Sequence, residues 1–201
     1  MEYLRDPSAI YEKSFAIIRS EADLSLLPAD ARAIAIRIIH ACGMVDAVDD
    51  LRITDDFTTA ATGALAKPIL TDAEMVRHGI IDKKLEMICT LNDPRAREIG
   101  MTTQTTRSAA AVELWAPHLE GSLVVIGNAP TALFRLLELI DAGAPKPAAI
   151  AAFPVGFVGA AESKDELVRN PRGLPYATIL GRRGGSAMAA ATVNALSKGL
   201  S

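Results

Sequence analysis

His40, with Arg37 beside it, is the side chain in this sequence that is best suited to acid–base chemistry. Arg37 and His40 stand three residues apart in the apolar segment 31–41, and this spacing places both on one face of a predicted helix, next to its apolar stripe. We expect the helix to end at Gly43, so that His40 lies in its last turn. The carboxyl end of a helix favours the protonated imidazole, whereas the charge of Arg37 opposes it. These opposed effects predict a ring that gives or takes a proton near neutral pH; a purely structural histidine is the alternative.

Ser14 is a polar residue within an otherwise apolar stripe. The pair Asp6-Pro7 predicts a helix that begins there, with an N-cap followed by a proline in the first turn. A serine inside such a helix ordinarily bonds back to the carbonyl oxygen four residues earlier. The apolar stripe around Ser14 consists of Ile10, Ile17 and Ile18.

Small residues and free backbone N–H groups follow three apolar runs that we predict as strands. The run 122–127 leads into Asn128, which we expect to cap the next helix, and the run 176–181 leads into Ser186 at another helix start. Lys164 follows the third run, in a sequence that fits a capping box. Helix amino termini of this kind gather at the carboxyl edge of a parallel sheet and bind anions, although turn formation alone also explains such residues.

Positive charge is concentrated in the carboxyl-terminal half of the chain. Residues 1–100 hold 12 Lys+Arg and 17 Asp+Glu, a net charge of −5, while residues 101–201 hold 9 and 7, a net charge of +2. Arg107 stands at the start of a predicted helix, where a cation is unfavourable unless an anion lies nearby. Arg107 and Lys164 are therefore candidate contacts for an acidic small molecule, with an ordinary solvated basic surface as the alternative.

The composition and the motifs that are missing exclude several classes of protein. A net charge of −3 with 22% charged residues argues against disorder and against a strongly basic partner of nucleic acid. No apolar run approaches the roughly 18 residues of a membrane span, and the first residues lack the order of a secretion signal, so we expect a cytoplasmic protein without a membrane partner. The two cysteines form no CxxC pair, and we expect no metal and no cofactor. A nucleotide or sugar-phosphate enzyme remains a rival, but the glycine motifs typical of such enzymes do not occur.

The order of elements predicts an α/β fold. From about residue 50, short apolar runs alternate with helical stretches, and the runs are continuously apolar, as in strands that are covered on both faces. We expect a single domain spanning residues 1–201, with a mainly parallel, Rossmann-like sheet and helices on both of its faces. The amino-terminal helices would pack on that sheet or on a second subunit. The six predicted strands lie within 51–54, 67–71, 85–91, 122–127, 148–153 and 176–181.

Distinctive segments occur along nearly the whole chain. The most specific are HACG at 40–43 and PVGFVGAAESK at 154–164. In combination with the others, they make the sequence resemble the precorrin-8X methylmutase family of cobalamin biosynthesis. The other segments are RDPSAIYEKSFAIIRSEADL, IRIIHACGMVDA, PILTDAEMVRHGI, EMICTLNDP, TRSAAAVELW, VVIGNAPTALFRLLELI and GRRGGSAMAAATVNAL.

The resemblance implies an isomerase that moves a methyl group from C-11 to C-12 of precorrin-8X and so forms hydrogenobyrinic acid. It implies no metal or redox cofactor, and a homodimer that binds the macrocycle near the subunit interface. Closely similar enzymes act on the cobalt-containing macrocycle. A carrier that binds the corrin product without turnover is the non-enzymatic alternative.

The resemblance also implies roles for particular residues. His40 corresponds to the proton donor or acceptor of the family, and Ser14 and Arg37 match positions that contact the substrate. Four further residues fall in matching segments, and we expect them to bind substrate on the physical grounds given above. They are Arg107, Asn128, Lys164 and Ser186.

Overall fold

Six strands form one sheet at the centre of the molecule. The structure is a computed structural model and describes residues 1–200. The strand order is β1-β6-β5-β4-β2-β3; β1 runs antiparallel to β6, and all other neighbours are parallel. Each of the six predicted runs contains a strand, so the mainly parallel α/β sheet is confirmed. The strands are β1 (Leu51–Ile53), β2 (Ile69–Thr71), β3 (Met87–Cys89), β4 (Leu123–Ile126), β5 (Ala149–Ala152) and β6 (Tyr176–Ile179).

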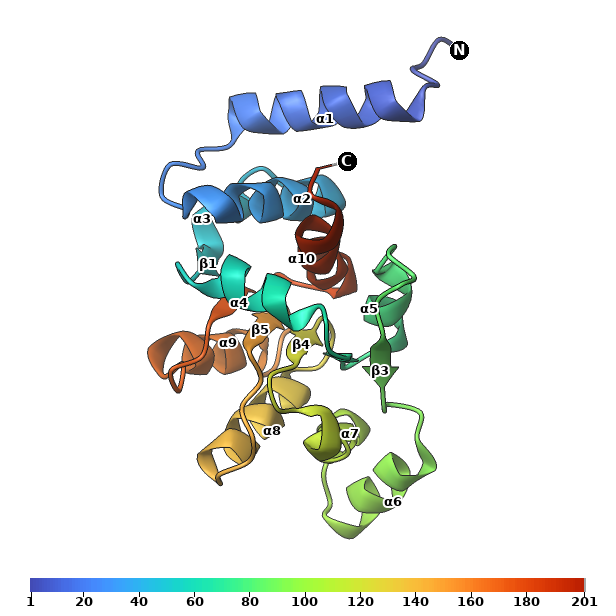
Figure 1. Cartoon of the computed structure of the whole chain (residues 1–201), viewed down its shortest axis with the longest axis vertical. Coiled ribbons are helices and arrows are strands. Elements are labelled where there is room, and N and C mark those ends of the chain that lie inside the picture. Colours follow the sequence, from blue (N-terminus) through green and yellow to red (C-terminus); the bar gives the residue numbers. More distant parts are fainter. Residues whose placement is uncertain (201) are drawn as a thin grey trace.

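Helices cover both faces of the sheet, which is why its central strands are apolar throughout (Figure 1). In β4, Leu123 and Val125 belong to the core beneath α4, α5 and α10, while Val124 and Ile126 belong to the core beneath α7, α8 and α9. On the first face lie α4 (Phe57–Ala64), α5 (Glu74–Gly79) and α10 (Ser186–Lys198). On the second face lie α7 (Arg107–Glu113), α8 (Pro130–Asp141) and α9 (Ala160–Arg169), with α6 (Pro94–Thr102) packed on α7.

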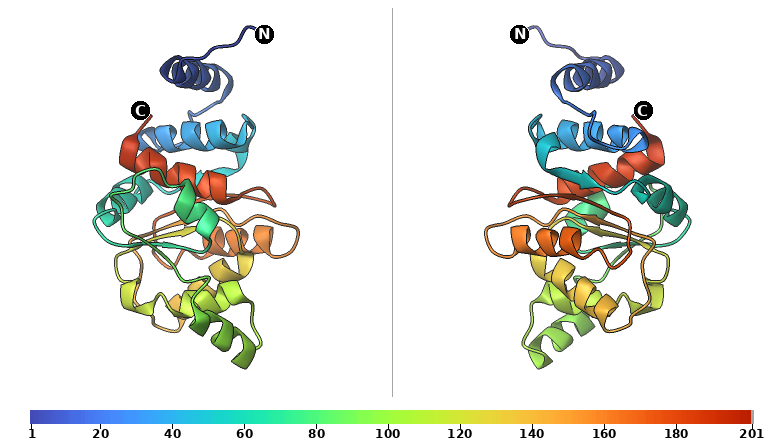
Figure 2. Two further views of the ribbon diagram at one scale, coloured as in Figure 1. Left: turned by 90° about the vertical axis from the view of Figure 1, so that its right-hand side faces the viewer. Right: turned by 90° about the vertical axis from the view of Figure 1, so that its left-hand side faces the viewer.

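The amino-terminal helices form further layers outside α10. Helix α2 (Arg32–Cys42) packs on α10, and α1 (Pro7–Glu21) packs on α2 as the outermost element (Figure 2). Helix α1 buries Phe15 and Ile18 but leaves Ile10 and Ile17 exposed, so the predicted apolar stripe only partly coincides with the buried face. The remaining elements are α3 (Ala47–Asp50) and two short 3-10 helices, Ala29–Ala31 and Ala116–His118. Among residues 1–200, no helix is both long and apolar enough to cross a membrane.

The ends of the first helices follow their local sequence signals. The Asp6 carboxylate accepts the N–H of Ala9 at 2.7 Å, and Pro7 begins α1, as predicted. Gly43 ends α2 in the left-handed conformation with φ 68°, which glycine adopts without steric cost.

Two predicted caps are wrong. Helix α8 begins at Pro130 after Ala129, and the Asn128 side chain does not cap it. Helix α9 begins earlier than predicted, after Gly159 with φ 80°, so Ser163 lies inside the helix and its hydroxyl bonds to the carbonyl of Ala160. In both places a backbone-specific residue, proline or glycine, sets the start of the helix.

Candidate active site

His40 faces a pocket of about 270 Å³ between the amino-terminal helices, the end of α5 and α10. Half of the residues around the pocket are alanine or glycine, which lets a flat ligand approach the backbone closely. The lining consists of Tyr11, Arg37, His40, Ala41, Gly79, Ile81, Ala187, Ala190, Ala191 and Asn194.

A hydrogen bond from another helix orients the His40 ring. The Ser14 hydroxyl oxygen on α1 lies 2.8 Å from Nδ1 of His40 on α2. Ser14 therefore makes this contact between helices instead of the back-bond expected of a helix serine. Because Nδ1 is engaged, Nε2 is the ring atom left for proton exchange with a ligand. Nε2 carries the proton when the Ser14 hydroxyl donates, and it is bare when the hydroxyl accepts.

Aromatic rings enclose the imidazole on the side of α1. The ring centroids of Tyr11 and Phe15 lie 5.2 Å and 5.3 Å from that of His40. Burial lowers the pKa of His40, and the positive charge of Arg37 lowers this pKa further. The two effects outweigh the helix terminus that we expected to favour protonation. Both effects favour the neutral ring over the protonated ring in the free protein.

Arg37 is a buried cation in the lining of the same pocket. Its side chain is only 7% exposed, and its Nε donates to the backbone carbonyl of Gly199. Burial lowers the pKa of Arg37, and Tyr11 opposes that change, but a guanidinium stays charged at neutral pH. The structure thus brings Ser14, Arg37 and His40 together. The helical spacing predicts the pairing of Arg37 with His40, but not the contact of His40 with Ser14.

Asp72 occupies the backbone donors that we had assigned to a bound anion. Its carboxylate accepts the N–H groups of Gly127, Asn128 and Ala129 at 2.8, 3.0 and 2.8 Å. Burial raises the pKa of Asp72, while these three N–H donors oppose the rise. The backbone at Asn128 is therefore satisfied within the chain. Ser186 lies beside this loop at the start of α10, and its hydroxyl donates to the Gly127 carbonyl at 3.5 Å.

Lys164 lies in α9, on the opposite face of the sheet from α10. Its side chain is completely buried, and its ammonium donates to the backbone carbonyl of Arg183. Burial lowers the pKa of Lys164 to about 8. A fully buried amine cannot reach a ligand carboxylate, so we revise Lys164 from a direct contact to a support of the loop around Arg183.

Arg107 is exposed at the first position of α7, which also covers the second face of the sheet. Helix α7, which carries Arg107, lies on the other side of the sheet from α10 and from α2, which carries His40 (Figure 1). Arg107 lines a different pocket, of about 210 Å³, together with Arg97 and Met101. Arg107 falls in a segment that resembles the family, but within one chain it does not lie in the pocket of His40.

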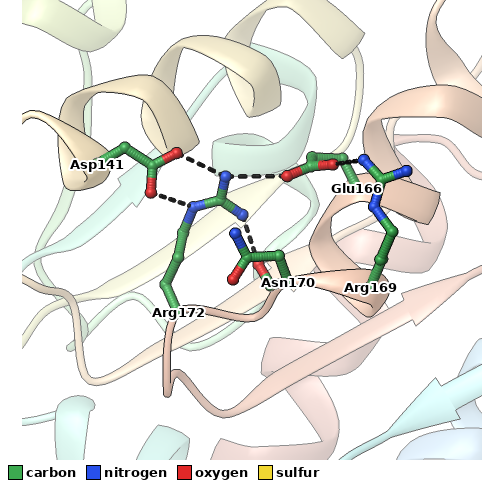
Figure 3. Close-up of polar contacts among 5 residues, drawn as sticks. All are labelled: Asp141, Glu166, Arg169, Asn170 and Arg172. Atoms are coloured by element: carbon green, nitrogen blue, oxygen red, sulfur yellow. Dashed lines mark hydrogen bonds and ion pairs between the residues drawn. The ribbon is translucent and has the colours of Figure 1, made fainter.

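The cations between residues 164 and 183 are largely neutralised within the chain. Figure 3 shows Arg172 between two carboxylates: its Nε and Nη2 donate to Asp141 at 2.8 and 2.7 Å, and Nη2 also donates to Glu166 at 3.0 Å. Arg169 pairs with the other oxygen of Glu166. The basic excess of this segment is thus mainly structural.

Two arginines of the loop after β6 differ in their surroundings. Arg183 pairs with Asp46 and Asp50, which ties the loop to α3. Arg182 is exposed and lies over the Phe157 ring, with its guanidinium carbon 5.4 Å from the ring centroid. No group of three or more His, Cys, Asp or Glu side chains within residues 1–200 is arranged to hold a metal ion.

Together, the fold and the pocket indicate an α/β enzyme. An α/β sheet supports a pocket in which a serine-oriented histidine stands beside a buried arginine, as in enzymes that exchange a proton with an acidic small molecule. The chain belongs to the precorrin-8X methylmutase family, whose sequence profile matches residues 9–198.

Individual relatives are similar over their whole length. Precorrin-8X methylmutase of Pseudomonas aeruginosa is 57% identical, with 98% of this chain and 97% of the relative covered. Cobalt-precorrin-8 methylmutase of Salmonella typhimurium is 39% identical over the same shares of the two chains. The crystal structure of precorrin-8X methylmutase from Thermus thermophilus has a TM-score of 0.84 and 32% identity, and covers 94% of each chain.

Proposed function

We propose that His40 is the acid–base residue of a methyl shift that converts precorrin-8X into hydrogenobyrinic acid. The chain is an isomerase of cobalamin biosynthesis by its family. The observation that supports the role of His40 is its position: Ser14 orients the ring, Arg37 adjoins it, and all three belong to one site.

A methyl shift between adjacent ring carbons needs no nucleophile from the protein. It needs the macrocycle held in one orientation and its electron demand biased toward the migrating methyl group. We infer that Nε2 of His40 gives a proton to a ring nitrogen of the macrocycle, or hydrogen-bonds to it. General acid assistance of this kind typically accelerates a reaction about 10²–10⁴-fold.

Through Arg37, a bound substrate can raise the pKa of His40. Precorrin-8X carries several carboxylates, and a carboxylate bound to the guanidinium would form charge-assisted hydrogen bonds. The same carboxylate would offset the charge that lowers the pKa of His40 in the free protein. His40 would then become protonated on binding, when the proton is needed.

The metal-free macrocycle is the better candidate for the natural substrate. Two relatives named for precorrin-8X are 57% and 54% identical to this chain and a third is 32% identical, whereas two relatives named for the cobalt form are each 39% identical. We expect no metal or redox cofactor in the reaction, and the predicted cytoplasmic location remains a prediction.

We further propose that two copies of the chain complete the site. A pocket of about 270 Å³ is at the small end for a drug-sized ligand, and a tetrapyrrole is larger, so the pocket accommodates only one edge of the macrocycle. Ile10 and Ile17 form an exposed apolar surface on α1 beside Tyr11 of the pocket. A second copy packed there would extend the binding surface.

The remaining substrate-binding candidates are assigned accordingly. Asn128 and Ser186 lie at the carboxyl edge of the sheet, where we propose that both contact the macrocycle. Asn128 would do so through its side chain, since Asp72 holds the backbone N–H groups of residues 127–129. Because Arg107 lies on the far face of the sheet, we propose that Arg107 of the partner subunit meets a carboxylate of the macrocycle. Lys164 would act indirectly through the loop at Arg183.

The experiment is a turnover assay with purified protein, followed by visible absorption and by chromatography of the product. Precorrin-8X should give hydrogenobyrinic acid over many turnovers, and faster than cobalt-precorrin-8 gives its isomer. A carrier would instead bind added hydrogenobyrinic acid stoichiometrically and would form no hydrogenobyrinic acid from precorrin-8X. A nucleotide or sugar-phosphate enzyme would show no change in the spectrum of either macrocycle. Sedimentation of the wild type and of an Ile10→Asp/Ile17→Asp variant tests the dimer, which that variant should dissociate.

A further inference from the structure

Asn194 on α10 holds the segment 79–81, where the chain leaves the end of α5 and forms one wall of the His40 pocket; we call this segment the 79–81 turn. Its Oδ1 accepts the backbone N–H of Ile81 at 2.9 Å, and its Nδ2 donates to the backbone carbonyl of Gly79 at 3.0 Å. The Asn194 side chain is thus bonded to both ends of the 79–81 turn. Gly79 and Ile81 line the pocket together with Asn194 itself.

The turn also packs closely against a side chain of α10. A Cβ atom added at Gly79 would lie 2.8 Å from the Cβ of Ala190, a distance that real Cβ atoms do not tolerate. Both residues line the pocket. Glycine at this position therefore lets the turn approach α10, and the Asn194 amide fixes it there.

We propose that Asn194 is a positioning residue for the methyl shift, which sets the place of the 79–81 turn and with it the width of the pocket around His40. Oδ1 and Nδ2 of Asn194 each bond to one backbone group of the turn, and this pair of bonds is what positions it. Its effect on the reaction is to hold one wall of the pocket at a fixed position relative to α10. Helix α10 packs on α2, which holds Arg37 and His40.

The effect of losing this support should appear in kcat. When the turn moves, the edge of the macrocycle is no longer held at one distance from His40, and a misplacement of about 1 Å can cost about 10²-fold in rate. Affinity depends on the whole macrocycle surface and should change far less. This inference rests on the proposed function, since it concerns the rate of the methyl shift.

The first test compares Asn194→Ala with Thr192→Val, a control on the same helix. Thr192 is buried, its hydroxyl donates to the Met188 carbonyl at 3.0 Å, and it does not line the pocket. Asn194→Ala should lower kcat about 10–100-fold and leave titration with hydrogenobyrinic acid nearly unchanged. Thr192→Val should lower Tm while kcat stays at the wild-type value. A wild-type kcat for folded Asn194→Ala, or an equal loss of kcat in both variants, would overturn the proposal.

A second pair of variants tests the turn without touching the asparagine. Gly79→Ala adds the methyl group that meets Ala190 and should push the turn outward, so that kcat falls. Adding Ala190→Gly removes the opposing methyl group and should restore much of the lost kcat. A double variant no faster than Gly79→Ala, or a Gly79→Ala variant with wild-type kcat, would contradict the proposed role of the turn. If Asn194→Ala does not fold, these two variants carry the test of the proposal.

The wild-type assay separates this inference from the function on which it rests. If the wild-type protein does not isomerise precorrin-8X, the proposed function fails, whatever the variants do. If the wild type turns over and the variants match it, only the role of Asn194 fails.

Discussion

The Ser14 hydroxyl on α1 lies 2.8 Å from Nδ1 of His40 on α2, so the outermost helix of the molecule orients the candidate catalytic ring. Phe15 and Ile18 of α1 pack with Ile36 and Ile39 of α2 and hold the two helices together. The polar contact and the apolar contact therefore belong to one interface. A change in the packing of α1 would act directly on the chemistry of His40.

Replacing Ser14 with alanine should lower kcat by about tenfold and leave Tm nearly unchanged. The variant removes the hydrogen-bond partner of Nδ1, so that the ring loses its preferred tautomer and orientation. One hydrogen bond contributes only roughly 0.5–1.5 kcal/mol to the free energy of unfolding, so Tm changes little. The measurement is steady-state turnover of precorrin-8X with a thermal melt of each variant.

Ser20→Ala is the matched control for Ser14→Ala. Ser20 lies on the same helix, is exposed, and its hydroxyl donates to the Ile17 carbonyl within its own turn at 2.8 Å. It should have wild-type kcat. Equal kcat for the two variants would show that the Ser14 contact does not matter to the reaction.

Arg37→Gln should shift the pH dependence of kcat/KM toward higher pH. If protonated His40 is the active form, kcat/KM of the wild type falls as pH rises through the pKa of His40, which burial and Arg37 hold below its ordinary value of 6.5. Removing the positive charge leaves only burial, so the pKa of His40 rises and the fall in activity occurs at higher pH.

The same variant should also bind substrate less tightly. Loss of a charge-assisted hydrogen bond of roughly 1.5–3 kcal/mol corresponds to an increase in KM of roughly 10- to 100-fold. Arg32→Gln, an exposed arginine one and a half turns earlier in α2, serves as the control. An unshifted pH profile for Arg37→Gln, or a shift toward lower pH, would mean that Arg37 does not act on the protonation of His40.

Local patterns were sufficient to predict the strands and the pairing of Arg37 with His40. Each strand is a short, continuously apolar run, and the spacing of three residues in α2 needs no information from elsewhere in the chain. Gly43 and Asp6 likewise act on their own helix. These features depend on neighbours within a few residues, which is why the sequence alone predicts them.

Lys164→Met should remove a pH dependence from the stability of the protein. The pKa of Lys164 is about 8 in the folded state and ordinarily 10.5, so between these values the unfolded chain binds more protons. The free energy of unfolding of the wild type should therefore rise between pH 8 and 9.5, relative to the variant, by about 1–2 kcal/mol.

Urea unfolding of both proteins at pH 7.5, 8.5 and 9.5 measures this difference. Lysines exposed in both states contribute equally to the two proteins, so subtracting the variant isolates Lys164. Parallel pH dependences would show that Lys164 is not a buried ammonium in solution.

Contacts between distant parts of the chain escaped prediction. Asp72 accepts N–H groups from residues 55 to 57 positions away, and Asn194 bonds to Gly79 and Ile81 across more than 110 residues. Lys164 looks like a surface cation until the carbonyl of Arg183 is placed against it. Such pairs produce no periodic pattern in the sequence, because each partner fits its own helix, strand or loop whether or not the other is present.

Turnover of His40→Ala tests the central claim most directly. It should fall about 10²–10⁴-fold, since the variant loses general acid assistance, while titration with hydrogenobyrinic acid should stay near the wild-type value. His118→Ala, at an exposed histidine, should behave as the wild type in both measurements. Wild-type turnover by His40→Ala would contradict the account.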